Sequence, residues 1–326
     1  MNLIDRFERK LTYLRVSLTD RCNLRCVYCM PPEGVQLLPR DQILRISEYE
    51  RLLSVFIKAG ITKIRLTGGE PLLRRGVTSL VRSLSQHPSL KEIALTTNGI
   101  YLKPLVPELI AEGITSVNIS LDSLNPHRYA AMTRGGDFYK VWDSIESCLS
   151  HGLKVKINVV AMQDLAFAEV DQFISLAMNN PIEIRFLEFM PLCGSASQSE
   201  SGINFRLLKE KILANYPLVP VLKQNGDVAS SYVLAAGKGR IGFIDSLSEP
   251  FCGDCNRLRL SSTGQLRLCL FSHAEVDLRT PLRAGATDAD LLQIIQEGAF
   301  NKPKGHEEIR RFVINEDLPP ILSIGG

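Results

Sequence analysis

The sequence predicts an α/β fold: a partial, TIM-like (β/α)6 barrel with a C-terminal α+β domain that closes the barrel. From residue 13 to residue 190, short apolar segments alternate with helical stretches, the pattern of repeated βαβ units. After Met190 the chain turns polar and rich in Ser and Gly, which is typical of a linker. We therefore expect a barrel domain over residues 1–205 and a second domain over residues 206–326.

The periodicity places each element in turn. Barrel strands are expected at residues 13–19, 63–67, 92–97, 115–121, 154–161 and 182–190. Helices are expected between them at residues 47–59, 76–85, 104–111, 138–151 and 167–178. The first helix carries a capping-box pattern, Ser47 with Glu50, while Gly60 and Gly152 stand where glycines end helices. Beyond the linker, short strands are expected over residues 216–243 and a helix near 288–298.

One face of the expected strands is basic. Because side chains alternate along a strand, one face gathers Arg15, Lys63, Arg65, Lys154, Lys156 and Arg185. The alternative is a solvated sheet face, but helices flanking the sheet leave no free face to solvate. Cations buried in such number require an anionic ligand. A polyanion inside the barrel, such as a nucleoside triphosphate, would supply it.

The composition narrows the functional classes. The formal net charge is only +3, so it points to neither a nucleic-acid nor a membrane partner. The first ten residues are charged rather than signal-like, and no apolar run is long enough to span a bilayer. We expect a cytoplasmic protein. Its eight cysteines are then candidates for metal or redox chemistry rather than disulfides.

Three cysteines follow the first expected strand. Cys22, Cys26 and Cys29 form a CxxxCxxC pattern in one loop. A structural zinc ion needs a fourth ligand, and no histidine precedes His87. Three thiolates on a 4Fe–4S cluster instead leave one iron open for a cofactor or substrate. The pattern therefore favours an iron–sulfur cluster.

A second group of three lies near the other end of the chain. Cys252, Cys255 and Cys269 have a C-x2-C-x13-C spacing, and with His273 they also spell a Cys3His zinc site. Two arginines, Arg257 and Arg259, follow Cys255 in alternation. They are more typical of a site that recognises phosphate or a base than of a purely structural zinc site. Of the two remaining cysteines, Cys148 falls in an expected helix as a small buried residue, and Cys193 lies in the polar linker without an assigned role.

The first motif resembles the radical S-adenosylmethionine (SAM) superfamily signature. Tyr28 stands before the third cysteine, as the aromatic residue does in that family, and the TGGEP stretch at residues 67–71 matches its glycine-rich motif. The resemblance implies that SAM chelates the open iron of the cluster. One electron then cleaves SAM to a 5′-deoxyadenosyl radical.

The whole chain resembles one family within that superfamily, the GTP 3′,8-cyclases of molybdenum cofactor biosynthesis. The resemblance rests on both cysteine groups, on residues 67–71, 95–99, 120–122, 185–190 and 251–259, and on the terminal Ile-Gly-Gly at residues 324–326. It implies a lyase that converts GTP to (8S)-3′,8-cyclo-7,8-dihydroguanosine 5′-triphosphate. It also implies an electron donor, product transfer to cyclic pyranopterin monophosphate synthase, and a homodimer as one assembly to consider.

The family's roles carry over residue by residue. Two 4Fe–4S clusters are implied, on Cys22, Cys26 and Cys29 and on Cys252, Cys255 and Cys269. SAM contacts fall on Tyr28, Gly69, Ser120 and Met190. GTP contacts fall on Arg15, Arg65, Thr96, Lys156, Arg257, Leu258 and Arg259, with Lys63, Arg185 and Asn256 as further candidates. The terminal Gly325 and Gly326 are implied to enter the active site and assist catalysis.

Two other functions remain open from the sequence. A radical SAM enzyme that modifies a peptide would share the first cysteine group and use auxiliary C-terminal clusters for electron transfer. A zinc-stabilised nucleic-acid-binding protein would use the second group, and it would need an exposed basic surface and little iron.

Overall fold

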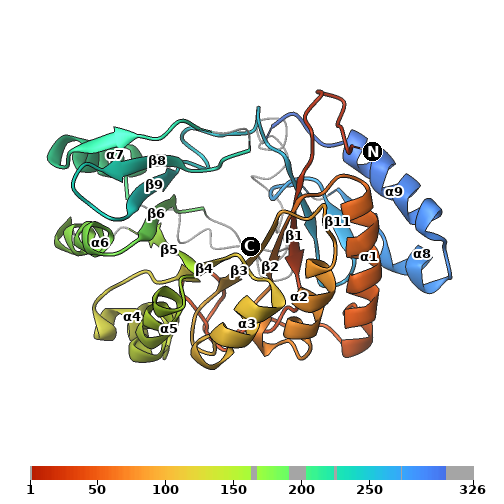
Figure 1. The fold of residues 1–326 in the computed structure, drawn as a ribbon, viewed down its shortest axis with the longest axis horizontal. Coiled ribbons are helices and arrows are strands. Elements are labelled where there is room, and N and C mark those ends of the chain that lie inside the picture. The colour runs from red at the N-terminus through yellow and green to blue at the C-terminus, as the bar shows by residue number, and fades with distance from the viewer. Residues whose placement is uncertain (1, 163–166, 191–202, 224–225, 273, 306–326) are drawn as a thin grey trace.

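The computed structural model describes residues 2–162, 167–190, 203–223, 226–272 and 274–305. Its strands form one twelve-stranded sheet. Figure 1 shows the sheet curving through the molecule, with the helices of the first half along its outer side. The α/β partial barrel predicted from the sequence is confirmed. No helix in these described ranges is long and apolar enough to cross a membrane.

All six strands expected in the first half are present. They are β1 (Tyr13–Ser17), β2 (Lys63–Thr67), β3 (Glu92–Thr97), β4 (Ser116–Ser120), β5 (Lys154–Ala161) and β6 (Ile182–Glu188). They pair in parallel and in chain order, as repeated βαβ units require.

The second half of the chain extends the same sheet at both edges. Its strands are β7 (Leu218–Pro220), β8 (Ser230–Leu234), β9 (Arg240–Ile244), β10 (Arg257–Leu260), β11 (Gln265–Arg267) and β12 (Glu275–Asp277). Strand β10 pairs in parallel with β1, and β9 pairs in parallel with β6. Antiparallel strands continue each edge, and among the described residues no pairing joins β12 to β7. The C-terminal half thus wraps the barrel without completing a hydrogen-bonded ring there.

Among the described residues, the helices follow the predicted order with three additions. They are α1 (Ile46–Lys58), α2 (Val77–Ser85), α3 (Val106–Glu112), α4 (Pro126–Thr133), α5 (Phe138–Ser150), α6 (Phe167–Asn179), α7 (Phe205–Asn215), α8 (Arg279–Arg283) and α9 (Asp288–Phe300). Helices α4, α7 and α8 were not predicted, although the start signal of α4 is in the sequence. Asn125 caps it by accepting from the backbone of His127, and Pro126 occupies the first helical position.

The predicted cap of the first helix is wrong by two residues. Helix α1 begins at Ile46, so Ser47 lies inside it, and Glu48 rather than Glu50 reaches back to accept from the Arg45 backbone N–H at 2.6 Å. Arg283 of α8 pairs with Glu48 at 2.7 Å and holds it there, a long-range contact that no local pattern contains. The glycine signals are confirmed, since Gly60 and Gly152 follow their helices with φ of 109° and 72°.

The apolar face of the strands forms the core. Leu14 and Val16 of β1 and Ile64 and Leu66 of β2 are fully buried in one cluster with residues of α1, including Phe56. Each such side chain contributes about 1.5–3 kcal/mol through burial. With the outer face committed to the helices, the opposite face of each strand is left for polar side chains.

Candidate functional site

The strand registers place the polar side chains on one inner face, here called the lumen. Arg15 of β1 aligns with Arg65 of β2 and with Arg259 of β10, so the three lie in one row across neighbouring parallel strands. Lys156 of β5 lies on the same face, while Lys154, at the start of β5, is exposed to solvent. The predicted basic face is therefore present at all of its positions except Lys154.

Arg65 is held deep in this row. It is 2% exposed, and its Nε donates to the Tyr13 hydroxyl at 2.7 Å. One terminal nitrogen donates to the Leu95 carbonyl at 3.1 Å and to Thr96 Oγ1 at 3.3 Å. All of these partners are uncharged in their ordinary states, so the contacts orient the guanidinium without neutralising it. Two residues assigned to GTP, Arg65 and Thr96, are thus in direct contact.

Part of the basic face is neutralised from within, which corrects the expectation that its cations need an external anion. Lys63 pairs with Glu92 at 2.8 Å. Glu183 pairs with Arg185 at 2.7 Å and with Lys156 at 3.3 Å. Both carboxylates obey the same alternation as the cations, so the sequence already contained the signal for them. The excess positive charge is concentrated instead on β1, β2 and β10.

Two pKa shifts report that excess charge. Burial opposes ionisation of Tyr13, but the charges of Arg65, Arg15 and Lys63 outweigh it and lower its pKa to about 7. Burial, with the like charges of Arg15 and Arg257, lowers the pKa of Arg259 to about 9. The row therefore favours a negatively charged ligand, whose charge would relieve this repulsion.

Unfilled acceptors on the lumen strands also fit a ligand. Within the described ranges, Asn118 Oδ1 of β4 and Asn158 Oδ1 of β5 are buried and accept no hydrogen bond. A buried polar atom left without a partner costs about 1–3 kcal/mol. Hydroxyl or amine groups of a bound ligand would remove that cost. Neither residue is among those that the sequence predicts to contact a ligand.

The first cysteine group lies in the loop after β1, packed against the glycine motif. A Cβ atom on Gly69 would lie 2.2 Å from the Arg21 carbonyl oxygen and 3.1 Å from the Cys22 nitrogen, so only glycine allows this approach. The Tyr28 hydroxyl donates to Asp122 Oδ2 at 2.6 Å. Burial raises the pKa of Asp122 to about 6. The loop is thus tied to the ends of strands β2 and β4.

A buried carboxyl group supports the same loop. Glu70 accepts from the backbone of Leu72 and Asn98 and from the Thr97 hydroxyl, at 2.8–3.0 Å. Burial raises its pKa to about 7 despite these bonds. The Asn98 side chain in turn donates to Cys22 Sγ at 3.8 Å. These supporting residues lie in the motifs at residues 67–71 and 95–99. Their roles depend on contacts between loops, which the motifs alone do not show.

The second cysteine group flanks the β10–β11 hairpin. Cys255 comes just before β10 and Cys269 just after β11. Burial opposes ionisation of Cys255, but the positive charges of Arg257 and Lys302 prevail and lower its pKa to about 6. The Arg257 guanidinium also donates to Cys255 Sγ at 3.6 Å. Thiolate, the form that binds iron, is therefore favoured here at neutral pH.

Each cysteine group supplies three thiols, a donor set whose chemistry suits an iron–sulfur cluster. All six cysteines of the two groups are free thiols. Within the part of the chain that the structure describes, no three His, Cys, Asp or Glu side chains gather closely enough to hold one metal ion. His273, the fourth ligand of the zinc alternative, lies outside the described residues.

The two cysteine groups lie at opposite ends of the lumen. The first follows the carboxyl end of β1, whereas Cys252 and Cys255 precede the amino end of β10, which runs parallel to β1 with Tyr13 beside Arg257. Cys269 follows β11, which is antiparallel to β10 and so returns to that same end. Strand β1, with five residues at about 3.3 Å each, spans about 17 Å between these two ends. The arginine row lies between them.

The remaining predicted residues fall in three places. Ser120 ends β4 on the lumen face, and Met190 is half-buried two residues beyond β6. Leu258 aligns with Leu14 and is fully buried in the core, so its side chain does not face the lumen. Cys148 is buried in α5, as predicted. Cys193, Gly325 and Gly326 lie outside the described residues.

Comparisons with known proteins bear on the family and the fold of this chain. Residues 16–177 match the Radical SAM superfamily, and residues 182–308 match Molybdenum Cofactor Synthesis C. Two solved structures share the fold with TM-scores of 0.61: SuiB of Streptococcus suis bound to S-adenosylmethionine, and anSMEcpe with bound AdoMet. They are 12% and 16% identical and cover 91% of this chain, which in turn covers 67% and 82% of theirs. At such identity the likeness concerns the fold alone.

Curated relatives are much closer in sequence. The GTP 3′,8-cyclase of Pelotomaculum thermopropionicum is 43% identical, over 99% of each chain. That of Moorella thermoacetica is 45% identical, over 93% of this chain and 94% of its own. Molybdenum cofactor biosynthesis protein moc-5 of Caenorhabditis elegans is 40% identical over 94% of this chain, which spans about half (51%) of that relative. This chain is a radical SAM protein and belongs to the GTP 3′,8-cyclase family.

Proposed function

We propose that this chain converts GTP to (8S)-3′,8-cyclo-7,8-dihydroguanosine 5′-triphosphate, the first step of molybdenum cofactor biosynthesis. One observation carries the proposal. Two cysteine groups occupy opposite ends of a lumen whose middle is a row of arginines. Membership of the GTP 3′,8-cyclase family supports GTP as the substrate that fills that row.

The triphosphate is assigned to the basic side of the lumen. Arg15, Arg65 and Arg259 share one row, and Arg257 lies on the same face of β10. Guanidinium groups bind phosphate oxygens in a two-pronged geometry, which fixes orientation as well as charge. Thr96 adds a hydroxyl beside Arg65, and Lys156 lies at the other side of the lumen. Lys63, Arg185 and Asn256 remain lesser candidates.

SAM is assigned to the end of the lumen that holds the first cysteine group. Cys22, Cys26 and Cys29 would hold the cluster there. Tyr28, Gly69, Ser120 and Met190 are the residues assigned to contact SAM itself. Together the cluster and SAM supply the one-electron cleavage that produces a hydrogen-abstracting radical. The chain's part is to bind SAM at the carboxyl ends of the strands, where loops meet, and to keep water away from the reacting centre.

Cys252, Cys255 and Cys269 would hold a second cluster, which would supply a binding site for the guanine base. With the base held at one end of the lumen and the phosphates on the arginines, the ribose is held between them and toward SAM. The hydrogen atom of ribose C3′ would pass to the 5′ carbon of the deoxyadenosyl group, and the resulting carbon radical would add to guanine C8. One electron from an external donor and one proton would then complete the product. Two-point anchoring keeps both reacting carbons aligned throughout.

Several parts of the proposal rest on the family alone. Gly325 and Gly326 are assigned a catalytic role at the end of the chain. An external electron donor, delivery of product to cyclic pyranopterin monophosphate synthase and a homodimer are proposed on the same basis. We also propose a division into two domains at residues 1–205 and 206–326. The strands of both parts belong to one sheet.

The test is anaerobic incubation of the iron-loaded protein with SAM, GTP and a low-potential reductant. We expect equal amounts of 5′-deoxyadenosine and cyclised GTP in excess of controls lacking either substrate. Formation of 5′-deoxyadenosine without a cyclised product would overturn the substrate. The peptide-modifying alternative draws only on fold neighbours such as SuiB, which has a structure with a bound precursor peptide and is 13% identical to this chain.

A further inference from the structure

A buried lysine lies beside the second cysteine group and belongs to neither the cysteines nor the arginine row. Lys302 follows helix α9 and is 3% exposed. Its Nζ donates to the Arg257 carbonyl at 2.9 Å and also to the Leu268 carbonyl. Arg257 comes two residues after Cys255, and Leu268 immediately precedes Cys269. One ammonium group therefore joins the two backbone segments that carry these cysteines.

The same ammonium is buried between these two segments. A lysine is rarely buried to this extent unless its polar head is compensated. The two backbone carbonyls are compensating groups here, and both belong to the segments that carry the cysteines.

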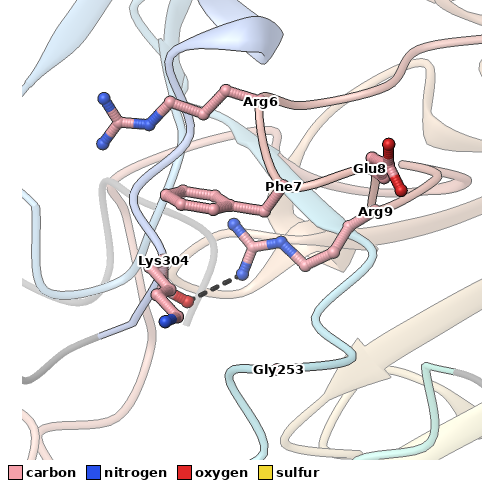
Figure 2. Close-up of a pocket in the computed structure, with 6 residues that line it drawn as sticks. All are labelled: Arg6, Phe7, Glu8, Arg9, Gly253 and Lys304. Carbon is pink, nitrogen blue, oxygen red and sulfur yellow. Dashed lines mark hydrogen bonds between the residues drawn. The ribbon is translucent and has the colours of Figure 1, made fainter.

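The third cysteine is tied to the same segment by Arg9. The Arg9 guanidinium donates to the Cys252 carbonyl at 2.7 Å, to the Lys304 carbonyl at 2.8 Å and to the Pro303 carbonyl at 2.6 Å. Figure 2 shows Arg9 reaching across to Lys304 at a cavity that Gly253 also lines. Residues 302–304 are thereby tied to the backbone segments that carry all three cysteines.

We propose that Lys302 is a positioning residue of the second cysteine group, setting the spacing between the Cys255 and Cys269 segments and placing a buried positive charge beside the cluster. The inference rests on the proposed second cluster and extends it to a residue that binds neither iron nor GTP. Reduction adds negative charge to a cluster, and a nearby cation stabilises the reduced state. Lys302 therefore raises the reduction potential of this cluster.

The test compares Lys302→Met with Lys304→Met. Methionine keeps a long side chain but removes the charge and the hydrogen bonds, and Lys304 is an exposed lysine two residues away. Both are made in a full-length background with Cys22, Cys26 and Cys29 changed to Ala, so that all bound iron belongs to the second group. We expect Lys302→Met to shift the midpoint potential to more negative values and to speed iron loss to a chelator. Lys304→Met leaves both unchanged.

The possible results separate this inference from the proposed function. If the background protein binds no iron, the second cluster itself is wrong. If it binds a cluster whose potential and chelator sensitivity do not respond to Lys302→Met, the role of Lys302 is wrong and the proposed function stands. Should Lys302→Met fail to fold, Lys302→Gln retains one donor without the charge. An unchanged potential in that variant would equally overturn the role.

Discussion

The backbone contact at Gly69 shows how one absent side chain can hold the first cysteine loop in place. A methyl group there would meet the Arg21 carbonyl at 2.2 Å and force the loop away from β2. Overpacking of this kind costs about 1–3 kcal/mol. We predict that Gly69→Ala loses most of the first cluster and lowers 5′-deoxyadenosine formation by about tenfold or more, each 1.4 kcal/mol being about a factor of ten.

Iron content and product yield measure this effect. Gly253→Ala is the matched control, because a Cβ atom there has nothing within 4 Å and the position lies in the other cysteine loop. A Gly69→Ala protein with full iron content and normal 5′-deoxyadenosine yield would show that the glycine motif does not set the loop position.

Tyr13 provides a pH-dependent test of the charge in the lumen. Its folded-state pKa of about 7 lies below the ordinary value of 10.0 because the neighbouring cations outweigh burial. Because Tyr13 ionises more easily in the folded than in the unfolded protein, its ionisation stabilises the fold. This stabilisation is complete above pH 10 and is lost as the pH falls through 7. The ionised phenol also repels triphosphate. We predict that GTP affinity falls as the pH rises through about 7, where Tyr13 ionises. If bound GTP raises the pKa of Tyr13 by one unit, the affinity falls by about tenfold.

Calorimetric GTP titrations of wild type and Tyr13→Phe across this pH range provide the measurement. The variant should bind GTP with a flatter pH profile, and its unfolding free energy should rise less between pH 7 and 10. Tyr139→Phe, at an exposed tyrosine, is the control and should follow wild type. Identical profiles for Tyr13→Phe and wild type would mean that Tyr13 does not ionise in the lumen.

At the scale of an element, alternate residues of strand β10 serve different purposes: those facing the lumen bind substrate, and those facing the core stabilise the fold. Arg259 faces the lumen beside Arg15, and Leu258 faces the core beside Leu14. We predict that Arg259→Met weakens GTP binding by at least about tenfold, since a hydrogen bond to a charged group is worth about 1.5–3 kcal/mol. Its melting temperature should hold or rise, because a buried charge among like charges is removed.

Leu258→Ala should behave in the opposite way. Removing a fully buried leucine costs about 2–5 kcal/mol of unfolding free energy, which lowers the melting temperature by several degrees. GTP affinity, measured well below that temperature, should change little. Thermal unfolding and GTP binding of the two variants decide the matter, and a Leu258→Ala protein that loses GTP binding while keeping its stability would contradict this division.

Elements differ in how much of them the sequence reveals. Strands β1 to β6 and most of their helices follow from local periodicity, and so does the basic face, because alternation is a property of neighbouring residues. The placement of β9 and β10 does not follow, since pairing with β6 and β1 joins residues far apart in the chain. The same limit explains why the ties from Lys302 to the cysteine segments were overlooked. Glu183 is different, because it follows the alternation of its strand and could have been placed beside Lys156 from the sequence.

At the scale of the whole molecule, the parallel pairing of β1 and β10 gives the lumen two chemically distinct ends. The cysteine motifs and the family resemblance could be recognised in the sequence, but not their separation, because that depends on the direction in which β10 joins the sheet. Radical generation at one end of the lumen and substrate binding at the other can therefore be lost independently. The two functions should therefore be separable by mutation.

We predict opposite defects for the two cysteine groups. Changing Cys252, Cys255 and Cys269 to Ala should leave reductive SAM cleavage in place, giving some 5′-deoxyadenosine but no cyclised GTP, and should weaken GTP binding. Changing Cys22, Cys26 and Cys29 to Ala should abolish 5′-deoxyadenosine while GTP still binds to the arginine row and the second cluster. Cys148→Ala, in the core of α5, is the control and should retain both activities. Product analysis and GTP titration under anaerobic conditions test all three, and cyclised GTP from the first of these variants would refute a two-ended site, because the base would then need no anchor at the amino end of β10.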